Sequence, residues 1–201
     1  MFITFEGGEG SGKTTIINNL HQFLLSLGRE VVLTREPGGT RISEEIRNII
    51  LNPENTDITS ATESILYAAS RAQHIELVIK PALDALKIVI CDRFLDSSYA
   101  YQAYARKLGM AFVKKVNTYA LPYVPSLTFY IDLTPQIGLG RIQNRSKRDR
   151  LDVEKIDFHN EVRKGYLKLA KKFKKRYVVI DGTKSIEEIT SLVISKIKEK
   201  L

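Results

Sequence analysis

The octapeptide GGEGSGKT occupies residues 7–14, directly after the apolar run Phe2-Ile3-Thr4-Phe5. It satisfies the pattern G-x-x-x-x-G-K-[ST] of a phosphate-binding loop. Glycines in such a loop let backbone N–H groups turn toward phosphate oxygens, Lys13 reaches the β- and γ-phosphates, and the Thr14 hydroxyl can ligate Mg²⁺. A helix that begins at Thr14 also directs its positive end at the anion. The stretch therefore predicts a strand, a triphosphate-binding loop and a helix, in that order.

The rest of the chain alternates apolar runs with helical stretches. Strands are expected at residues 2–6, 30–34, 87–91, 127–132 and 177–181. Helices are expected at residues 14–27, 43–51, 61–86, 96–108, 112–119, 135–144, 157–173 and 185–200. The strands are too continuously apolar to leave one face in water, which favours a parallel sheet covered on both sides. The pattern predicts a three-layer α/β/α fold with a five-stranded parallel sheet, in one domain over residues 1–201.

Composition narrows the class of protein. With 201 residues, 43% of them hydrophobic, the chain is long enough to bury a core without disulfides. Cys91 is the only cysteine and ends an apolar run, so we expect it to be buried in a protein of the reducing cytoplasm. The N-terminus has no basic segment followed by a long apolar one, and no stretch is long enough to span a membrane. We therefore expect a soluble, cytoplasmic protein with no membrane partner.

The net charge of +8 favours anionic partners, such as nucleotides or nucleic acid. Much of this charge is concentrated in residues 163–176, where apolar residues recur at helical spacing between the basic ones. That pattern is typical of a solvated helix face, and strand binding would also require exposed aromatic residues among the charges. We therefore expect nucleotides as partners and no nucleic acid.

Two further segments carry candidate chemistry. The predicted strand at 87–91 ends in Asp92-Arg93, and a carboxylate at a strand tip opposite a phosphate loop is placed to hold Mg²⁺ directly or through water. A surface ion pair explains this dipeptide equally well when it is considered alone. Residues 143–157 form a polar, arginine-rich segment. Such segments are usually solvated loops, but in phosphate transfer they can form a lid that excludes water and stabilises charge.

Residues 92–102 read DRFLDSSYAYQ, and here the chain resembles the thymidylate kinase family, whose members phosphorylate dTMP with ATP. The family pattern is close to D-R-[YFH]-x-x-S-x-x-A-Y-Q. The segments TREPGGT at 34–40, LYAASRAQH at 66–74 and RLD at 150–152 are also similar to family elements, in family order. The resemblance covers essentially the whole chain. It implies a P-loop nucleoside monophosphate kinase fold with a lid at about 143–157.

The resemblance implies an acceptor site for dTMP. Arg71 matches the arginine that binds a thymine carbonyl, and Tyr67, four residues earlier on the same helical face, matches the aromatic residue that stacks on the base. The family usually has Phe there, so the Tyr67 hydroxyl needs a partner. Tyr101 lies where a ring would crowd a ribose 2′-OH. The positions implied to hydrogen-bond the base or line its pocket are Ser97, Ser98 and Gln102.

Arginines are implied for the phosphate of dTMP, because the guanidinium fork gives bidentate bonds to phosphate oxygens. The candidates are Arg93, Arg35 and Arg47, and Glu36 is placed in the same acceptor site. Ordinary packing or surface charge would explain any one of these positions taken alone, but not all of them together.

The loop residues Glu9 and Gly10 assign the chain to one branch of the family. A carboxylate beside a triphosphate should be repelled, and in the family an acid at this position contacts the sugar and phosphate of the acceptor. One family type has a catalytic arginine at the next position, and the other supplies arginine from the lid. Because residue 10 is glycine, the chain resembles the lid-arginine type, with Arg150 as the best match and Arg145 and Arg148 as neighbours.

The implied catalytic residues are Lys13, Arg93 and Arg150. Mg²⁺ is expected on Thr14 and Asp92. Arg141 matches a family arginine that lies against adenine, although a surface arginine at a helix end is an equal alternative, and Asp181-Gly182-Thr183 would form the far wall of that site. The candidate ATP-binding residues are Gly7, Gly8, Glu9, Gly10, Ser11, Gly12, Lys13, Thr14, Thr15, Arg141 and Asp181.

The sequence thus predicts a kinase that converts ATP and dTMP to ADP and dTDP by direct transfer, and the resemblance implies a homodimer. A kinase for another pyrimidine nucleotide or for a deoxynucleoside is the nearest alternative. A nucleic-acid-stimulated ATPase is a more distant one. That class would need a second energy-coupling motif, and none is apparent after Asp92.

Overall fold

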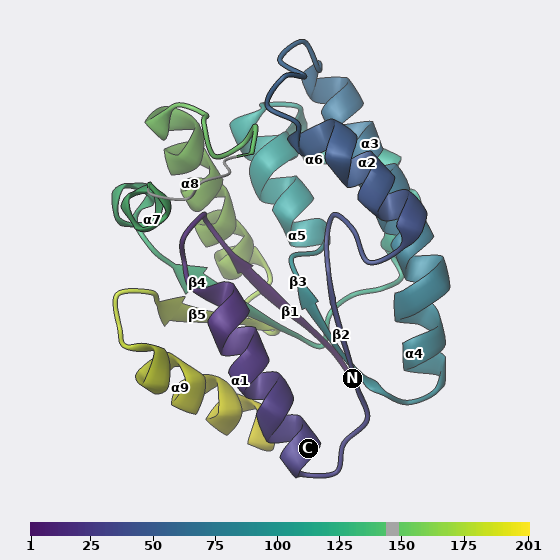
Figure 1. The fold of residues 1–201 in the computed structure, drawn as a ribbon, viewed down its shortest axis with the longest axis vertical. Coiled ribbons are helices and arrows are strands. Elements are labelled where there is room, and N and C mark those ends of the chain that lie inside the picture. The colour runs from purple at the N-terminus through teal and green to yellow at the C-terminus, as the bar shows by residue number, and fades with distance from the viewer. Residues whose placement is uncertain (144–148) are drawn as a thin grey trace.

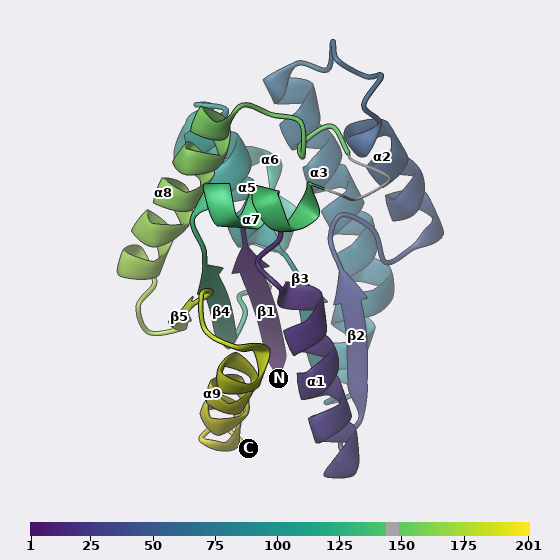
Figure 2. The ribbon, with the colours of Figure 1, turned by 60° about the vertical axis from the view of Figure 1, so that its left-hand side comes forward.

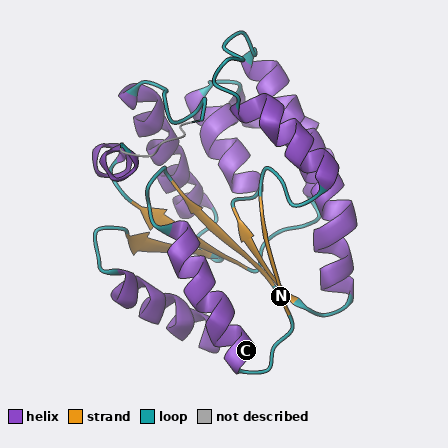
Figure 3. Ribbon diagram, in the orientation of Figure 1, coloured by secondary structure: helices purple, strands orange, loops and turns teal. Residues whose placement is uncertain are grey.

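A computed structural model describes residues 1–143 and 149–201 of the chain. The described residues contain one sheet of five strands in the order β2-β3-β1-β4-β5, with every neighbouring pair parallel (Figures 1 and 3). This confirms the predicted five-stranded α/β fold. The strands are β1 (Phe2–Gly7), β2 (Val31–Arg35), β3 (Ile88–Asp92), β4 (Leu127–Asp132) and β5 (Tyr177–Asp181).

Helical segments connect the strands, and each predicted helix has a counterpart in the described residues. The long helix predicted at 61–86 consists of three segments end to end, the middle one a π-helix, and the segment predicted at 96–108 also contains a π-helix. The elements are α1 (Lys13–Ser26), α2 (Arg41–Leu51), α3 (Ser60–His74), η1 (Ile75–Ile79), α4 (Lys80–Asp84), α5 (Leu95–Ser98), η2 (Tyr99–Ala105), α6 (Gly109–Val116), η3 (Thr118–Ala120), α7 (Pro135–Ile142), α8 (Ile156–Lys172) and α9 (Ile186–Lys198).

Local side chains define where several helices begin. The hydroxyls of Thr40, Thr59 and Ser185 each accept a hydrogen bond from a backbone N–H of the first turn of α2, α3 and α9. Ser185 and Glu188 form a reciprocal capping box, which satisfies two N–H groups that a helix start leaves unpaired. Pro135 opens α7, where its missing N–H would have had no partner inside the helix.

The core lies on both faces of the sheet. On one face, α1 and α9 pack against the central strands (Figure 2). Leu20, Leu24 and Val193 are buried there. On the other face, α8 and η2 cover β4, with Tyr130 and Tyr166 stacked at 4.9 Å between ring centroids. The helices η1 and α4 bury Val89 of β3 on this same face. The sheet is therefore the middle layer of three.

The prediction that no strand has a solvent-exposed face is wrong for the two edge strands, β2 and β5. Leu33 of β2 is 40% exposed and Val179 of β5 is 49% exposed. Each of these strands pairs on one side only, so the flanking helices, which centre on β1, β3 and β4, cover them incompletely. The continuous apolar character that indicated full burial holds for the three inner strands alone.

The predicted motifs meet at the carboxyl ends of the strands, as expected for a parallel sheet. β1 lies between β3 and β4, with Phe5 opposite Asp92. Backbone bonds continue past the ladder, from Arg93 N–H to the Phe5 carbonyl and from Glu36 N–H to the Asp92 carbonyl, both at 2.9 Å. The loop after β1 and the segments after β2 and β3 are thus fixed beside one another.

Candidate functional site

The loop that follows β1 is shaped to hold phosphate. Gly12 adopts the left-handed conformation at φ 85° and is the residue before α1, so the first N–H groups of that helix face the loop. Lys13 is buried, and its ammonium donates to the Gly7 and Gly8 carbonyls and to Ser11 Oγ, each at 3.2 Å. Burial lowers the pKa of Lys13. The contacts of its Nζ place Lys13 where the motif predicts an anion.

Gly10 is at the tightest point of this loop. Its φ is +66°, and a Cβ atom there would lie 2.1 Å from the carbonyl oxygen of Gly138 in α7. Gly138 has the matching restriction, since its own Cβ would lie 2.2 Å from the Glu9 carbonyl oxygen. A side chain at residue 10 would thus require α7 to move. The loop consequently has no room for the basic residue found in the other family type.

The Glu9 carboxylate faces away from the loop, toward the segment after β3. Its Oε1 accepts from Arg93 Nη2 at 2.8 Å and from the Tyr101 hydroxyl at 2.9 Å. Burial alone would raise the pKa of Glu9, but Arg93 and Lys13 outweigh it and lower the pKa from 4.5 to about 2. The structure thus brings together three predicted site residues from two distant motifs. Glu9 is ionised and accessible from two adjoining pockets.

Arg93 adopts an unusual backbone conformation, with φ at +70°. Such a conformation is strained for a residue with a side chain, and it is typical of functional sites. It directs the guanidinium over the Tyr101 ring, 5.2 Å from the centroid, and within 3.2 Å of the Tyr166 hydroxyl. Arg93 lines both pockets, as Arg47 does, so both pockets can use its charge.

Glu6 helps to hold this turn, and sequence reasoning missed it. Its buried carboxylate accepts from the Phe94 N–H at 2.9 Å, from Ser97 Oγ at 2.6 Å and from the Tyr166 hydroxyl at 2.8 Å. Burial is the largest cause that raises the pKa of Glu6, to about 7, and the charge of Asp96 adds to it. The sequence feature that could have indicated this role is an acidic residue at the end of an otherwise apolar strand.

The first pocket collects the residues implied to bind dTMP. All of those predictions except Arg35 line it, and Tyr67, Arg71, Ser98 and Gln102 lie on its wall. The complete lining is Glu9, Glu36, Pro37, Arg47, Leu51, Tyr67, Arg71, Arg93, Phe94, Ser97, Ser98, Tyr101, Gln102, Asp149 and Leu151. Residues of α2, α3, η2 and the segment after 148 thus enclose one cavity with apolar and polar walls.

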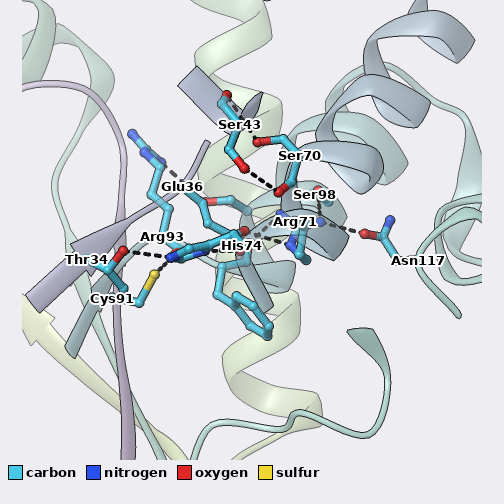
Figure 4. Close-up of polar contacts among 12 residues, drawn as sticks. Thr34, Glu36, Ser43, Ser70, Arg71, His74, Cys91, Arg93, Ser98 and Asn117 are labelled. Carbon is cyan, nitrogen blue, oxygen red and sulfur yellow. Dashed lines mark hydrogen bonds and ion pairs between the residues drawn. The ribbon is translucent and has the colours of Figure 1, made fainter. Parts of the chain in front are cut away.

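Arg71 lines this pocket, and several hydrogen bonds hold its buried side chain (Figure 4). Its Nε donates to Glu36 Oε2 at 2.7 Å, and its Nη1 donates to Ser98 Oγ at 3.0 Å and to Asn117 Oδ1 at 2.5 Å. Glu36 also contacts His74 Nδ1 at 3.1 Å. Asn117 and His74 escaped sequence analysis because their role depends on contacts between segments far apart in the chain. The result is a buried guanidinium in a fixed orientation.

Arg35 and Arg47 line the second pocket, which is also lined by loop residues 9–15. Arg35 is largely exposed and donates to both oxygens of Glu44, at 2.8 and 2.9 Å. Arg47 donates to the Pro37 carbonyl at 2.8 Å, and burial together with the nearby Arg35 charge lowers its pKa. Two cations that disfavour each other in this way are stabilised by a bound anion. Arg35 therefore faces the phosphate side and not the base pocket.

Asp92 is placed as the metal prediction requires. It lines the second pocket together with Thr14, and its Oδ1 is buried without a hydrogen-bond partner among the described residues. A buried carboxylate oxygen without a partner is costly unless a ligand satisfies it. Thr14 is exposed at the start of α1 and lines the same pocket as Asp92.

Arg150, predicted to reach the γ-phosphoryl group when the lid closes, points to α2 and α3 in this structure, and its catalytic role stays a prediction. Its guanidinium is buried, with Nε donating to the Ile50 carbonyl at 2.8 Å and Nη2 at 2.5 Å from Glu63 Oε2. Its backbone N–H donates to the Leu51 carbonyl at 3.0 Å. A partner carboxylate in α3 thus draws the side chain away from the phosphate loop. Arg145 and Arg148, the other candidates in the lid, lie outside the described residues.

The predicted adenine side is assembled from three segments. Arg141 at the end of α7 donates to the Gly10 and Gly182 carbonyls, each at 3.4 Å. Asp181 accepts from Thr183 through both the backbone N–H, at 2.9 Å, and the hydroxyl, at 2.7 Å. Arg141 is therefore beside the phosphate loop and the end of β5, and its contact with adenine stays a prediction.

Comparisons with known proteins agree with this geometry. The family model described as thymidylate kinase matches residues 5–193. Curated thymidylate kinases from Acholeplasma laidlawii and a Geobacillus species are 53% and 50% identical to the chain, and each alignment covers 100% of it and 100% and 97% of the relative. A solved structure of thymidylate kinase from Ehrlichia chaffeensis superposes with a TM-score of 0.81, at 35% identity over 98% of both chains.

Glu6→Gln should change how stability depends on pH. The Glu6 pKa is about 7 in the folded chain against 4.5 for an ordinary glutamate, so the folded state binds more protons between these values. Stability of the wild type must then fall as pH rises through that window, by about 3 kcal/mol for this group. Urea unfolding at pH 5 and pH 8 should show this slope in the wild type and lose it in the variant. Parallel pH profiles would contradict the placement of Glu6.

Arg150→Ala should lower the free energy of unfolding by about 2–4 kcal/mol, because it leaves the Glu63 carboxylate buried with one partner fewer. Arg41→Ala is the control, since Arg41 forms an exposed pair with Glu45 and should lose less than about 0.5 kcal/mol. Both are measured by urea unfolding. If the variant keeps its stability and only kcat falls, the result would instead indicate that Arg150 contacts the transferred phosphoryl group during catalysis.

Proposed function

The chain belongs to the thymidylate kinase family, and we propose that it transfers the terminal phosphoryl group of ATP to dTMP across its two adjoining pockets. The observation that carries this proposal is the pairing of Glu9 with Arg93. A loop that only bound a triphosphate would have no use for a carboxylate, whereas Glu9 connects the loop to the first pocket, which suits a nucleoside monophosphate.

The donor nucleotide is assigned to the second pocket. The loop amides and Lys13 bind the β- and γ-phosphates, and the first turn of α1 contributes its positive end. Arg141 packs along adenine, with Asp181 and the two residues after it as the opposite wall. This assignment uses the preformed ammonium contacts of Lys13 and the position of Arg141 between the loop and β5.

The acceptor is assigned to the first pocket. Thymine stacks on Tyr67, which is buried, and meets Arg71 at its carbonyl edge. Tyr101 lies under the sugar, held by its bond to Glu9, so that a 2′-OH has little space. The phosphate of dTMP then lies beside Arg93, between the two pockets.

The chemistry needs no covalent enzyme intermediate, because an oxygen of the acceptor phosphate is itself the nucleophile. It attacks the γ-phosphorus of ATP, the bond to the β-phosphate oxygen breaks, and ADP and dTDP result. Charge spreads over the oxygens of the transferring group in a loose transition state. Lys13, Arg93 and Arg47 surround the space in which that charge develops, and their preorganisation supplies the stabilisation.

Mg²⁺ is proposed as the cofactor, held by Asp92 and the Thr14 hydroxyl. No group of three or more metal-ligating side chains exists among residues 1–143 and 149–201. That is expected for Mg²⁺, which commonly takes one or two protein oxygens and completes its shell with waters and phosphate oxygens. The unpartnered Asp92 oxygen fits this role. When bound, the ion neutralises charge on the β- and γ-phosphates.

Assembly and location remain predictions. A homodimer is supported by apolar side chains exposed on neighbouring helices, such as Ile49 on α2 and Ile65 on α3, which are 48% and 50% exposed. None of the helices in the described part of the chain has the length and apolar character needed to cross a bilayer. The single cysteine is buried, and we propose the cytoplasm as the compartment.

Asp92→Asn should raise the Mg²⁺ concentration needed for half-maximal activity by about 10- to 100-fold, because the amide keeps the shape but loses the charge. Asp84→Asn, on an exposed carboxylate paired with Lys80, is the control and should leave that concentration unchanged. Initial rates across a Mg²⁺ titration at saturating ATP and dTMP provide the measurement. An equal response in the two variants would remove Asp92 from the metal site.

A substrate panel tests the function itself. Coupled assays of ADP release should give the highest kcat/KM on dTMP among dTMP, dUMP, UMP, CMP and thymidine. A higher value on any other acceptor would identify a different pyrimidine kinase. ATP hydrolysis that is stimulated by DNA, in the absence of any monophosphate, would instead indicate a nucleic-acid-dependent ATPase.

A further inference from the structure

Glu63 is a buried carboxylate behind the wall of the acceptor pocket. It lies on α3, four residues before Tyr67, and is 1% exposed. It belongs to none of the motifs that the sequence reveals. Its Oε1 accepts from Gln102 Nε2 at 2.9 Å and from Arg106 Nε at 3.3 Å. Its Oε2 accepts from Arg106 Nη2 at 3.1 Å and from Arg150 Nη2 at 2.5 Å.

The two guanidiniums keep Glu63 ionised. Burial would raise its pKa, but the charge of Arg106 and the hydrogen bonds from Arg150, Gln102 and Arg106 hold the pKa below its usual range. An ionised carboxylate has no proton and can only accept hydrogen bonds. Whatever faces Glu63 must therefore donate.

This requirement determines which way the Gln102 amide points. A glutamine carries an acceptor oxygen and a donor nitrogen on the same planar group, and a flip exchanges the two. With Glu63 beside it, the nitrogen is the atom that must face the carboxylate. Gln102 is 2% exposed and lines the acceptor pocket, and its amide donates from Nε2 to Glu63, which leaves Oε1 as the acceptor end of the group. The Gln102 Oε1 atom can thus accept a hydrogen bond from a ligand in the pocket.

Arg71 supplies the complementary donor in the same pocket. A guanidinium can only donate, and three of its contacts, to Glu36, Ser98 and Asn117, fix its plane. The pocket wall therefore presents one donor and one acceptor. Thymine presents a carbonyl at C4 and an N–H at N3, which match this pair. Cytosine presents an amino donor at C4, which would face the Arg71 donor, and an unprotonated N3 acceptor, which would face the Gln102 oxygen.

We propose that Glu63 is a specificity-determining residue that acts through Gln102, by fixing the amide so that the pocket takes pyrimidines with an N3–H and rejects those with a bare N3. The inference rests on the proposed function, because it places the base of dTMP in the first pocket. Without the Glu63 charge, the amide can turn over and present its nitrogen, and a cytosine-type edge then finds a donor for its N3.

The test compares two acceptors that differ only at this edge, dTMP and 5-methyl-dCMP. For each protein the measured quantity is the ratio of kcat/KM on dTMP to kcat/KM on 5-methyl-dCMP. In Glu63→Gln this ratio should fall at least about tenfold, since an unfixed amide no longer excludes the wrong hydrogen-bond pattern. The fall should include a gain on 5-methyl-dCMP and not only a loss on dTMP, which a general weakening of the fold would not produce.

Glu154→Gln is the matched control. Glu154 is in the same cluster, pairs with Arg106 at 2.6 Å and loses the same charge, but no contact joins it to Gln102 among the described residues. Its ratio should stay within about twofold of the wild type. If Glu63 only supports the fold, both variants will lower both activities and leave the ratio unchanged, and the proposal is then overturned.

Gln102→Met covers the case in which Glu63→Gln does not fold. It removes the amide and keeps both arginine pairs of Glu63, and the ratio should fall at least about tenfold here too. An unchanged ratio in Gln102→Met would overturn the proposal on its own. A wild type that cannot phosphorylate dTMP would refute the proposed function and this inference together. An active wild type with unchanged ratios in the variants would refute this inference alone.

Discussion

The ion pair between Glu9 and Arg93, at 2.8 Å, is the contact on which the rest of the site depends. It exists because β1 and β3 are neighbours in a parallel sheet, so the segments that follow them emerge side by side. One partner belongs to the phosphate loop and the other to the acceptor pocket. Arg93 reaches it only by accepting a strained backbone, with φ at +70°, which Glu6 supports through the Phe94 N–H. The Glu9–Arg93 pair therefore lies between the acceptor pocket and the phosphate-loop pocket and joins them in one site.

Buried carboxylates organise the arginines around this pair. Glu36 orients Arg71, and Glu63 holds Arg106 and Arg150, each carboxylate 4% exposed or less. Burying charge is expensive, and an apolar core of the same volume can be as stable. The ion pairs instead fix the orientation of the arginine side chains, since each carboxylate holds the N–H donors that face it. The acceptor pocket is therefore rigid before any nucleotide binds, which reduces the entropy lost on binding.

Much of this was predictable, because contiguous motifs encode it. The phosphate loop, the strand ends and the residues at 92–102 each carry their own pattern, and all five strands lie within two residues of their predicted bounds. What could not be predicted depends on contacts across the fold. Arg150 meets a partner 87 positions away, so its sequence neighbours gave no sign that it is buried. Glu63 and Asn117 belong to no sequence motif. The solvent-exposed faces of β2 and β5 follow from their place at the edges of the sheet, and hydrophobic periodicity does not reveal the order of the strands.

The two pockets are expected to hold one base and one chain of phosphates together. A crystal structure with ATP and dTMP joined through their terminal phosphates tests this directly. We expect thymine stacked on Tyr67 with its C4 edge on Arg71 and Gln102, and phosphates that run from Arg93 to Lys13. Thymine bound outside this pocket, or phosphates with no contact to Arg93, would contradict it.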